Sequence, residues 1–220
     1  AISKPGQAVL MPRNVHCSII NACVLGNLKP VLFDLPFKPD RGHYVPADQH
    51  WMRKILDQLV HMCVECSVVV MVHPTYQGYA NDLAPLVKEL HLRNFSVLVD
   101  EAHGTHFASC VDSKLPPSAL HAGADLVVHS LHKSALGLVQ TAVLWLQGSR
   151  VDPFAIERSI RLLQTTSPSS LLLASCESSL SEWTSQSGQD KLITRLGESR
   201  LLFEKLQKET SIVPFLALID

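Results

Sequence analysis

The stretches VLVDEAHG (residues 97–104) and ADLVVHSLHKS (residues 124–134) decide how the rest of the chain is interpreted. Each contains an apolar, β-branched run that stops abruptly at polar residues. This pattern is typical of a strand buried on both faces of a sheet, with a carboxyl end that opens onto a site. The first stretch ends in the carboxylate of Asp100, and the second ends in Ser130, His132 and Lys133.

The two strand ends predict one shared pocket. In an open α/β sheet ligands bind beyond the carboxyl ends of the strands, so the acid of Asp100 and the amine of Lys133 can converge there. That combination suits pyridoxal phosphate, which needs a lysine to form a Schiff base and an acid to keep its pyridine nitrogen protonated. Pyridoxal phosphate is therefore the predicted cofactor.

The remaining pattern predicts alternating strands and helices. Strands are expected at residues 7–11, 30–33, 68–72, 95–99 and 140–146, in the run before Ser130, and at 212–219. Helices are expected at 15–25, 51–62, 83–90, 118–121, 152–163, 169–183 and 190–208, and residues 34–46 are expected to form a loop. This order predicts an α/β fold with a mostly parallel, doubly wound sheet, helices on both faces and a helical C-terminal part.

Composition excludes several partner classes. The 220 residues carry a formal net charge of -1 with 18% charged residues, so no basic surface for nucleic acid is expected. No apolar run approaches the length of a membrane span, so no membrane partner is predicted. The six cysteines lack the spacing of a disulfide framework, which favours a reducing, cytoplasmic environment. Cys63 and Cys66 form a CxxC without a second pair, so they are interpreted as ordinary thiols.

Five motifs in order carry a family resemblance. They are PRNVH (12–16), PTYQG (74–78), DEAHG (100–104), SLHKS (130–134) and TTSPS (165–169). Together they closely resemble the bacterial-type ornithine/lysine/arginine decarboxylases, pyridoxal-phosphate enzymes of the aspartate-aminotransferase fold (fold type I). The resemblance extends from about residue 5 to about residue 179 and implies decarboxylation of arginine, lysine or ornithine, with arginine slightly favoured.

The resemblance also implies residue roles. Lys133 is the implied Schiff-base lysine, and Asp100 is the implied partner of the pyridine nitrogen. Protonation of the α-carbon is assigned to Lys133 or to His103, a histidine beside a carboxylate-bearing strand end that can titrate near neutrality. Further implied cofactor contacts are His16 against one face of the ring, Ala102 and His103 along the other side, and Ser130 and His132 at the phosphate.

The same resemblance implies a domain division and a homo-oligomer. Residues 1–185 correspond to the cofactor-binding large domain without the upstream segment that forms the phosphate-binding turn. Residues 186–220 correspond to a linker helix and the start of a C-terminal domain. Sites of this fold borrow residues across a two-fold axis, and the Thr165–Ser167 corner lies near that interface in the family, so at least a homodimer is expected.

Several alternatives stay open at this point. The same lysine and aspartate serve aminotransferases and C–S lyases of this fold, and a catalytically inactive chain could act as an interaction subunit. Asp100 could be a helix cap and His16 a core residue, while Tyr76 could line the cleft or cover a turn. DEAH also resembles a helicase motif, but the chain has no P-loop. His103 and His106 lack supporting ligands, so no metal is predicted.

Overall fold

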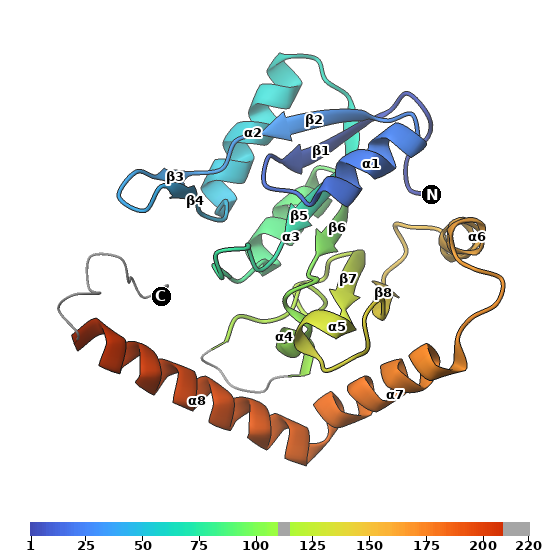
Figure 1. The fold of residues 1–220 in the computed structure, drawn as a ribbon. Coiled ribbons are helices and arrows are strands. Elements are labelled where there is room, and N and C mark those ends of the chain that lie inside the picture. Colours follow the sequence, from blue (N-terminus) through green and yellow to red (C-terminus); the bar gives the residue numbers. More distant parts are fainter. Residues whose placement is uncertain (110–114, 209–220) are drawn as a thin grey trace.

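The computed structural model describes residues 1–109 and 115–208. Its centre is a six-stranded sheet in the order β2-β1-β5-β6-β7-β8 (Figure 1). The strands are β1 (Ala8–Pro12), β2 (Lys29–Phe33), β5 (Cys66–Val72), β6 (Ser96–Asp100), β7 (Leu126–Ser130) and β8 (Ala142–Leu146). Only β8 runs antiparallel to its neighbour in this sheet. The predicted α/β fold with a mostly parallel sheet is confirmed.

Helices cover both faces of the sheet because strand side chains alternate between the two sides. On one face, Leu10 and Val69 lie in the same core cluster as residues of α2 (Gln49–His61) and α3 (Ala84–Leu92). On the other face, Val9 and Val68 pack with α1 (Cys17–Leu25). Leu126 of β7 packs with α6 (Pro153–Leu163) on that face. The strands are therefore enclosed, as their continuous apolar runs predict.

Side-chain caps fix where the longer helices begin. Asp48 accepts a hydrogen bond from the amide of Trp51 at 2.7 Å and caps α2. Asp152 caps α6, whose first residue is a proline, a position where the missing N–H costs nothing. Ser169 caps α7 (Ser170–Thr184). Finally, α8 (Gln186–Lys208) begins four residues before the predicted start, because the hydroxyl of Ser185 accepts from the amide of Gly188 at 3.0 Å.

The segment of residues 34–46 is not only a loop. It contains the antiparallel pair β3 (Phe37–Lys38) and β4 (His43–Tyr44). The rings of Phe37 and Tyr44 pack edge to face with centroids 5.1 Å apart, and Gly42 takes the positive φ (+69°) that this tight connection needs. Three prolines, Pro36, Pro39 and Pro46, make this short hairpin hard to predict from the sequence.

The helix predicted at 118–121 is wrong. These residues form turns that end at Gly123, with φ at +88°. The amide of Ala119 and the hydroxyl of Ser118 bond to the carboxylate of Glu101 instead of supporting a helix start. Two short helices that the pattern does not predict, α4 (Thr105–Ser109) and α5 (Leu131–Ser134), follow β6 and β7.

The C-terminal part is helical, as predicted. In Figure 1, α7 and α8 extend past the end of the sheet where β6 and β7 finish. The amide of Leu138, just after α5, donates to the hydroxyl of Ser175 in α7 at 2.8 Å and ties this helix to the sheet. The strand predicted at 212–219 lies outside the described residues. Among the residues that are described, no helix is long and apolar enough to cross a membrane.

Candidate active site

Parallel strands deliver the predicted residues to one edge of the sheet. Asp100 is the last residue of β6 and lies in register with Val72 of β5 and Val128 of β7. β7 continues two residues further to Ser130 and runs directly into α5, which carries Lys133. The sheet therefore brings the acid and the amine to the same edge, because the carboxyl ends of parallel neighbours coincide.

Lys133 directly contacts one of the other predicted residues. Its Nζ lies 3.3 Å from Nε2 of His103. Because an ammonium group can only donate, Nε2 of His103 accepts, and the ring proton of the neutral histidine lies on Nδ1. The ring of Tyr76 packs edge-on against His103, with centroids 5.3 Å apart. Tyr76 thus belongs to this group and does more than cover a turn.

The electrostatic effects on His103 indicate that Asp100 and His16 lie near Lys133, His103 and Tyr76. Burial lowers the pKa of His103, and Lys133 lowers it further, whereas Asp100 raises it and His16 lowers it. Burial likewise raises the pKa of Tyr76, and the charge of Asp100 raises it further. Charges at an accessible surface act over short distances only, so these side chains share one neighbourhood.

The other predicted cofactor contacts differ in how they are held. His16 caps α1, its Nδ1 accepting from the amide of Ser18 at 3.2 Å. Ala102, two residues after Asp100, is buried at 7% exposure. Ser130, the last residue of β7, is buried at 9% exposure. His132 faces the carbonyl of Thr141 with Nδ1 at 3.0 Å, so Nδ1 donates and only Nε2 is left for a ligand. The assigned roles stay predictions.

A cavity of about 410 Å³ adjoins this group. It is lined by Tyr76 and His103, together with Phe107, Pro116 and Arg200 of α8. Its size lies within the range of small-molecule sites, which run from about 300 to 1,000 Å³. His103 therefore has a cavity beside it that is large enough for a small molecule.

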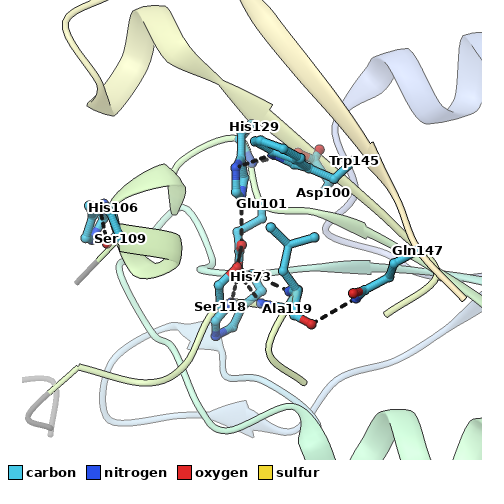
Figure 2. Close-up of polar contacts among 12 residues, drawn as sticks. His73, Asp100, Glu101, His106, Ser109, Ser118, Ala119, His129, Trp145 and Gln147 are labelled. Carbon is cyan, nitrogen blue, oxygen red and sulfur yellow. Dashed lines mark hydrogen bonds and ion pairs between the residues drawn. The ribbon is translucent and has the colours of Figure 1, made fainter. Parts of the chain in front are cut away.

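A second polar group, which the sequence pattern does not predict, lies next to Asp100 around Glu101. The carboxylate of Glu101 is fully buried and bonds to the side chains of His73 and His129 (Figure 2). The only signal in the sequence is a second acid at a strand end that the pattern predicts to be buried. Its partners His73 and His129 are far away in the sequence, so no local motif indicates them.

Comparison with known proteins decides the family. Residues 1–218 match the family model described as "Orn/Lys/Arg decarboxylase, major domain". The chain belongs to this family. It therefore shares ancestry with the ornithine/lysine/arginine decarboxylases that its five motifs resemble.

Members of the Orn/Lys/Arg decarboxylase family with curated names are similar over most of the chain. An arginine decarboxylase of Bacillus cereus is 34% identical over 177 residues, which cover 80% of this chain and 37% of the relative. An arginine decarboxylase of Halalkalibacterium halodurans is 36% identical over 173 residues, covering 79% and 34%. The chain thus spans about a third of the length of these relatives.

Solved structures agree on the fold of this decarboxylase-family chain. The constitutive lysine decarboxylase of E. coli has a TM-score of 0.75 at 22% identity, covering 95% of this chain and 30% of that one. A pyridoxal-phosphate-bound C–S lyase of Staphylococcus hominis has a TM-score of 0.64 at 13% identity, covering 94% and 49%. At these identities the likeness shows fold type I and no more.

The donor set fits pyridoxal phosphate. A primary amine and a carboxylate stand at neighbouring strand ends, the pair that this cofactor requires. In addition, the hydroxyl of Ser134, next to Lys133, is buried and has no hydrogen-bond partner within the described part of the chain. Buried polar atoms normally have a partner, so an orphaned hydroxyl beside the lysine suits a site that binds a polar ligand.

Proposed function

We propose that this chain carries the pyridoxal-phosphate site of an enzyme that decarboxylates a basic amino acid, with arginine ahead of lysine and ornithine. Membership of the Orn/Lys/Arg decarboxylase family supports the activity, and the arginine decarboxylases of Bacillus cereus and Halalkalibacterium halodurans support the substrate. One observation carries the proposal. Nζ of Lys133 lies 3.3 Å from Nε2 of His103, at the same edge of the sheet where β6 ends with Asp100.

Each residue has a defined task in this proposal. The bound cofactor supplies the electron sink for the electron pair that departing CO2 leaves behind. Lys133 holds the cofactor through Nζ, and Asp100 holds the proton on the pyridine nitrogen. Because burial and Lys133 lower the pKa of His103, its ring is neutral at neutral pH. His103 can then take the proton that Nζ must lose before it reacts, and the same pair can return a proton to the product.

The remaining contacts orient the cofactor. His16 would pack against one face of the ring and Ala102 would border the other side, while Ser130 and His132 would bind the phosphate. Since Nδ1 of His132 already donates to Thr141, His132 can donate to a phosphate only in its imidazolium form.

The proposal includes a homodimer or larger oligomer in the cytoplasm. Large apolar side chains on α6 and α7 are exposed: Phe154 (77%), Leu162 (79%), Leu163 (80%), Leu171 (68%) and Leu173 (57%). Such a surface is typical of one that another chain covers. The cysteines of residues 1–109 and 115–208 carry free thiols, which suits a reducing compartment. Residues 1–185 form the cofactor-binding domain in this proposal, and residues 186–220 lead out of it.

A spectrum and a CO2 assay test the function. The chain is mixed with pyridoxal phosphate, its visible absorption is recorded, and release of CO2 from arginine, lysine and ornithine is measured. We expect a visible band from lysine-bound cofactor that Lys133→Ala abolishes. Lys88→Ala, which removes an exposed lysine of α3, should keep the band.

The same assay separates the alternatives. Equal spectra for the wild type and Lys133→Ala would contradict the proposal and favour an inactive chain that acts as an interaction subunit. A band that changes with an amino acid while no CO2 is released would favour an aminotransferase or a C–S lyase instead.

A further inference from the structure

The carboxylate of Glu101 is the centre of a closed hydrogen-bond network. Oε1 accepts from Nδ1 of His73 at 2.8 Å and from the amide of Ala119 at 2.8 Å. Oε2 accepts from Nε2 of His129 at 2.7 Å and from the hydroxyl of Ser118 at 2.5 Å. Figure 2 shows these groups converging on Glu101, one residue after Asp100. A carboxylate has about four acceptor sites, so all of them are used.

The surrounding partners fix where the protons lie. The indole N–H of Trp145 can only donate, and it reaches Nδ1 of His129 at 2.9 Å, so Nε2 of His129 carries a proton and donates to Glu101. The carbonyl of Asn81 can only accept, and it lies 2.9 Å from Nε2 of His73, so that nitrogen is protonated as well. One further proton then lies between Nδ1 of His73 and Oε1 of Glu101.

Hydrogen bonds keep the carboxylate of Glu101 ionised. Burial raises the pKa of Glu101, but hydrogen bonds from His129, His73, Ser118 and Ala119 outweigh burial and lower it to about 2. Glu101 is therefore an anion that accepts a hydrogen bond from His73, and both side chains are at most 1% exposed.

The hydrogen-bonded residues His73 and Glu101 are connected to Asp100 on both sides. The amide of His73 donates to the backbone carbonyl of Asp100 at 3.0 Å, and the amide of Glu101 donates to the carbonyl of Val128 at 3.0 Å. The amide of Ala102 then donates to Oδ1 of Asp100 at 3.2 Å. The ends of β5, β6 and β7 are thus joined around the one residue that faces the predicted ring nitrogen.

We propose that the Glu101 network (His73, Glu101, Ser118, His129 and Trp145) is a positioning device that holds the Asp100 carboxylate in place for the pyridine nitrogen of the cofactor. This inference rests on the proposed function, because that function is what assigns Asp100 its task. Glu101 touches neither cofactor nor substrate in this scheme. It acts by fixing the backbone on either side of Asp100.

The first test needs no cofactor and reads the backbone around Asp100. Amide hydrogen exchange is measured in the cofactor-free chain for the wild type, Ser118→Ala and Trp145→Phe, each of which removes one donor from the network. Glu101→Gln is the stronger variant, but it removes the buried carboxylate that accepts all four hydrogen bonds, so the two milder variants carry the test. Glu89→Gln is the control, because Glu89 is another buried carboxylate, bound to Arg53 at 2.8 Å on α3.

We expect exchange at the amides of His73 and Ala102 to become at least ten times faster in Ser118→Ala and Trp145→Phe. The amide of Val97, which donates to Asp125 at 2.8 Å near the start of β6, should keep its rate. The control should leave all three amides unchanged. Unchanged rates at His73 and Ala102 in the network variants would overturn the proposal, and so would an equal acceleration by Glu89→Gln.

The second test reads the cofactor. With pyridoxal phosphate labelled with ¹⁵N in the ring, the nitrogen chemical shift reports whether the pyridine nitrogen is protonated. We expect that nitrogen to lose its proton at least one pH unit lower in Ser118→Ala and Trp145→Phe than in the wild type and in Glu89→Gln. An identical titration in all four would overturn the positioning role.

Failure of the proposed function and failure of the positioning role can be distinguished. If the wild type binds no pyridoxal phosphate at Lys133, the proposed function fails. In that case the exchange measurement still decides whether the Glu101 network holds the backbone of Asp100.

Discussion

At the scale of single residues, His106 makes the stability of the chain depend on pH. The pKa of His106 is lowered to about 4, chiefly by burial, while the charge of Glu101 raises it and the nearby His129 and His73 lower it. The unfolded chain, with a histidine pKa of about 6.5, binds more protons than the folded chain below that pH. Stability contributed by neutral His106 is therefore complete above pH 6.5 and is lost as the pH falls towards 4.

The expected loss from His106 is about 2 kcal/mol of unfolding free energy between pH 7.5 and pH 5. Urea unfolding at the two pH values measures it, with His106→Gln as the comparison. The variant should lose about 2 kcal/mol less than the wild type over this interval. Equal losses in the two proteins would show that His106 is not buried as a neutral ring.

Asp100 allows a second prediction at this scale. Asp100→Asn removes the charge that keeps the ring nitrogen protonated, so CO2 release should fall by about 100-fold or more. The visible band of lysine-bound cofactor should persist, because Lys133 is intact. Asp57→Asn on the exposed side of α2 is the matched control and should keep full activity. Full activity in Asp100→Asn would contradict its assignment.

At the scale of elements, the turn between β6 and α4 is packed too tightly for any side chain at position 104. A Cβ on Gly104 would lie 2.7 Å from Cγ of Glu101, 2.8 Å from Phe107 and 2.9 Å from Cδ of Pro74. Gly104→Ala should therefore lower the unfolding free energy by about 1–3 kcal/mol, as overpacking does. Gly197→Ala, in the open interior of α8, should instead raise it by about 0.5–1 kcal/mol. Thermal unfolding of both variants measures these changes in unfolding free energy. An unchanged unfolding free energy in Gly104→Ala would contradict the tight packing around position 104.

The elements also show how far the sequence predicts the molecule. Helices α2, α6 and α7 could be predicted because Asp48, Asp152 and Ser169 cap them locally. The turn at 118–123 could not, because its backbone and hydroxyl groups bond to Glu101, 17 and 18 residues away in the sequence. Asp100 ends β6 and Lys133 follows the end of β7 by three residues, so the strand pattern places both at one edge of the sheet. His73 and His129 reach Glu101 only because β5, β6 and β7 are neighbours in the sheet, so the sequence alone does not indicate the Glu101 network.

At the scale of the whole molecule, the exposed apolar side chains of α6 and α7 predict self-association. Leu171 and Leu173 are 68% and 57% exposed, and one charge on this surface should weaken a dimer that buries it. We expect a dimer or larger species in sedimentation velocity at micromolar concentration and a shift towards the monomer in Leu171→Glu. Lys54→Glu changes charge on exposed α2 and should leave the assembly unchanged. A monomeric wild type would contradict the prediction.

The account as a whole depends on Lys133 being the residue that binds pyridoxal phosphate. The most direct measurement is to mix the chain with the cofactor, reduce the complex with borohydride and map the modified residue by peptide mass spectrometry. The account predicts one stoichiometric pyridoxyl group, on Lys133. A label spread over surface lysines, with Lys133 unmodified, would contradict it.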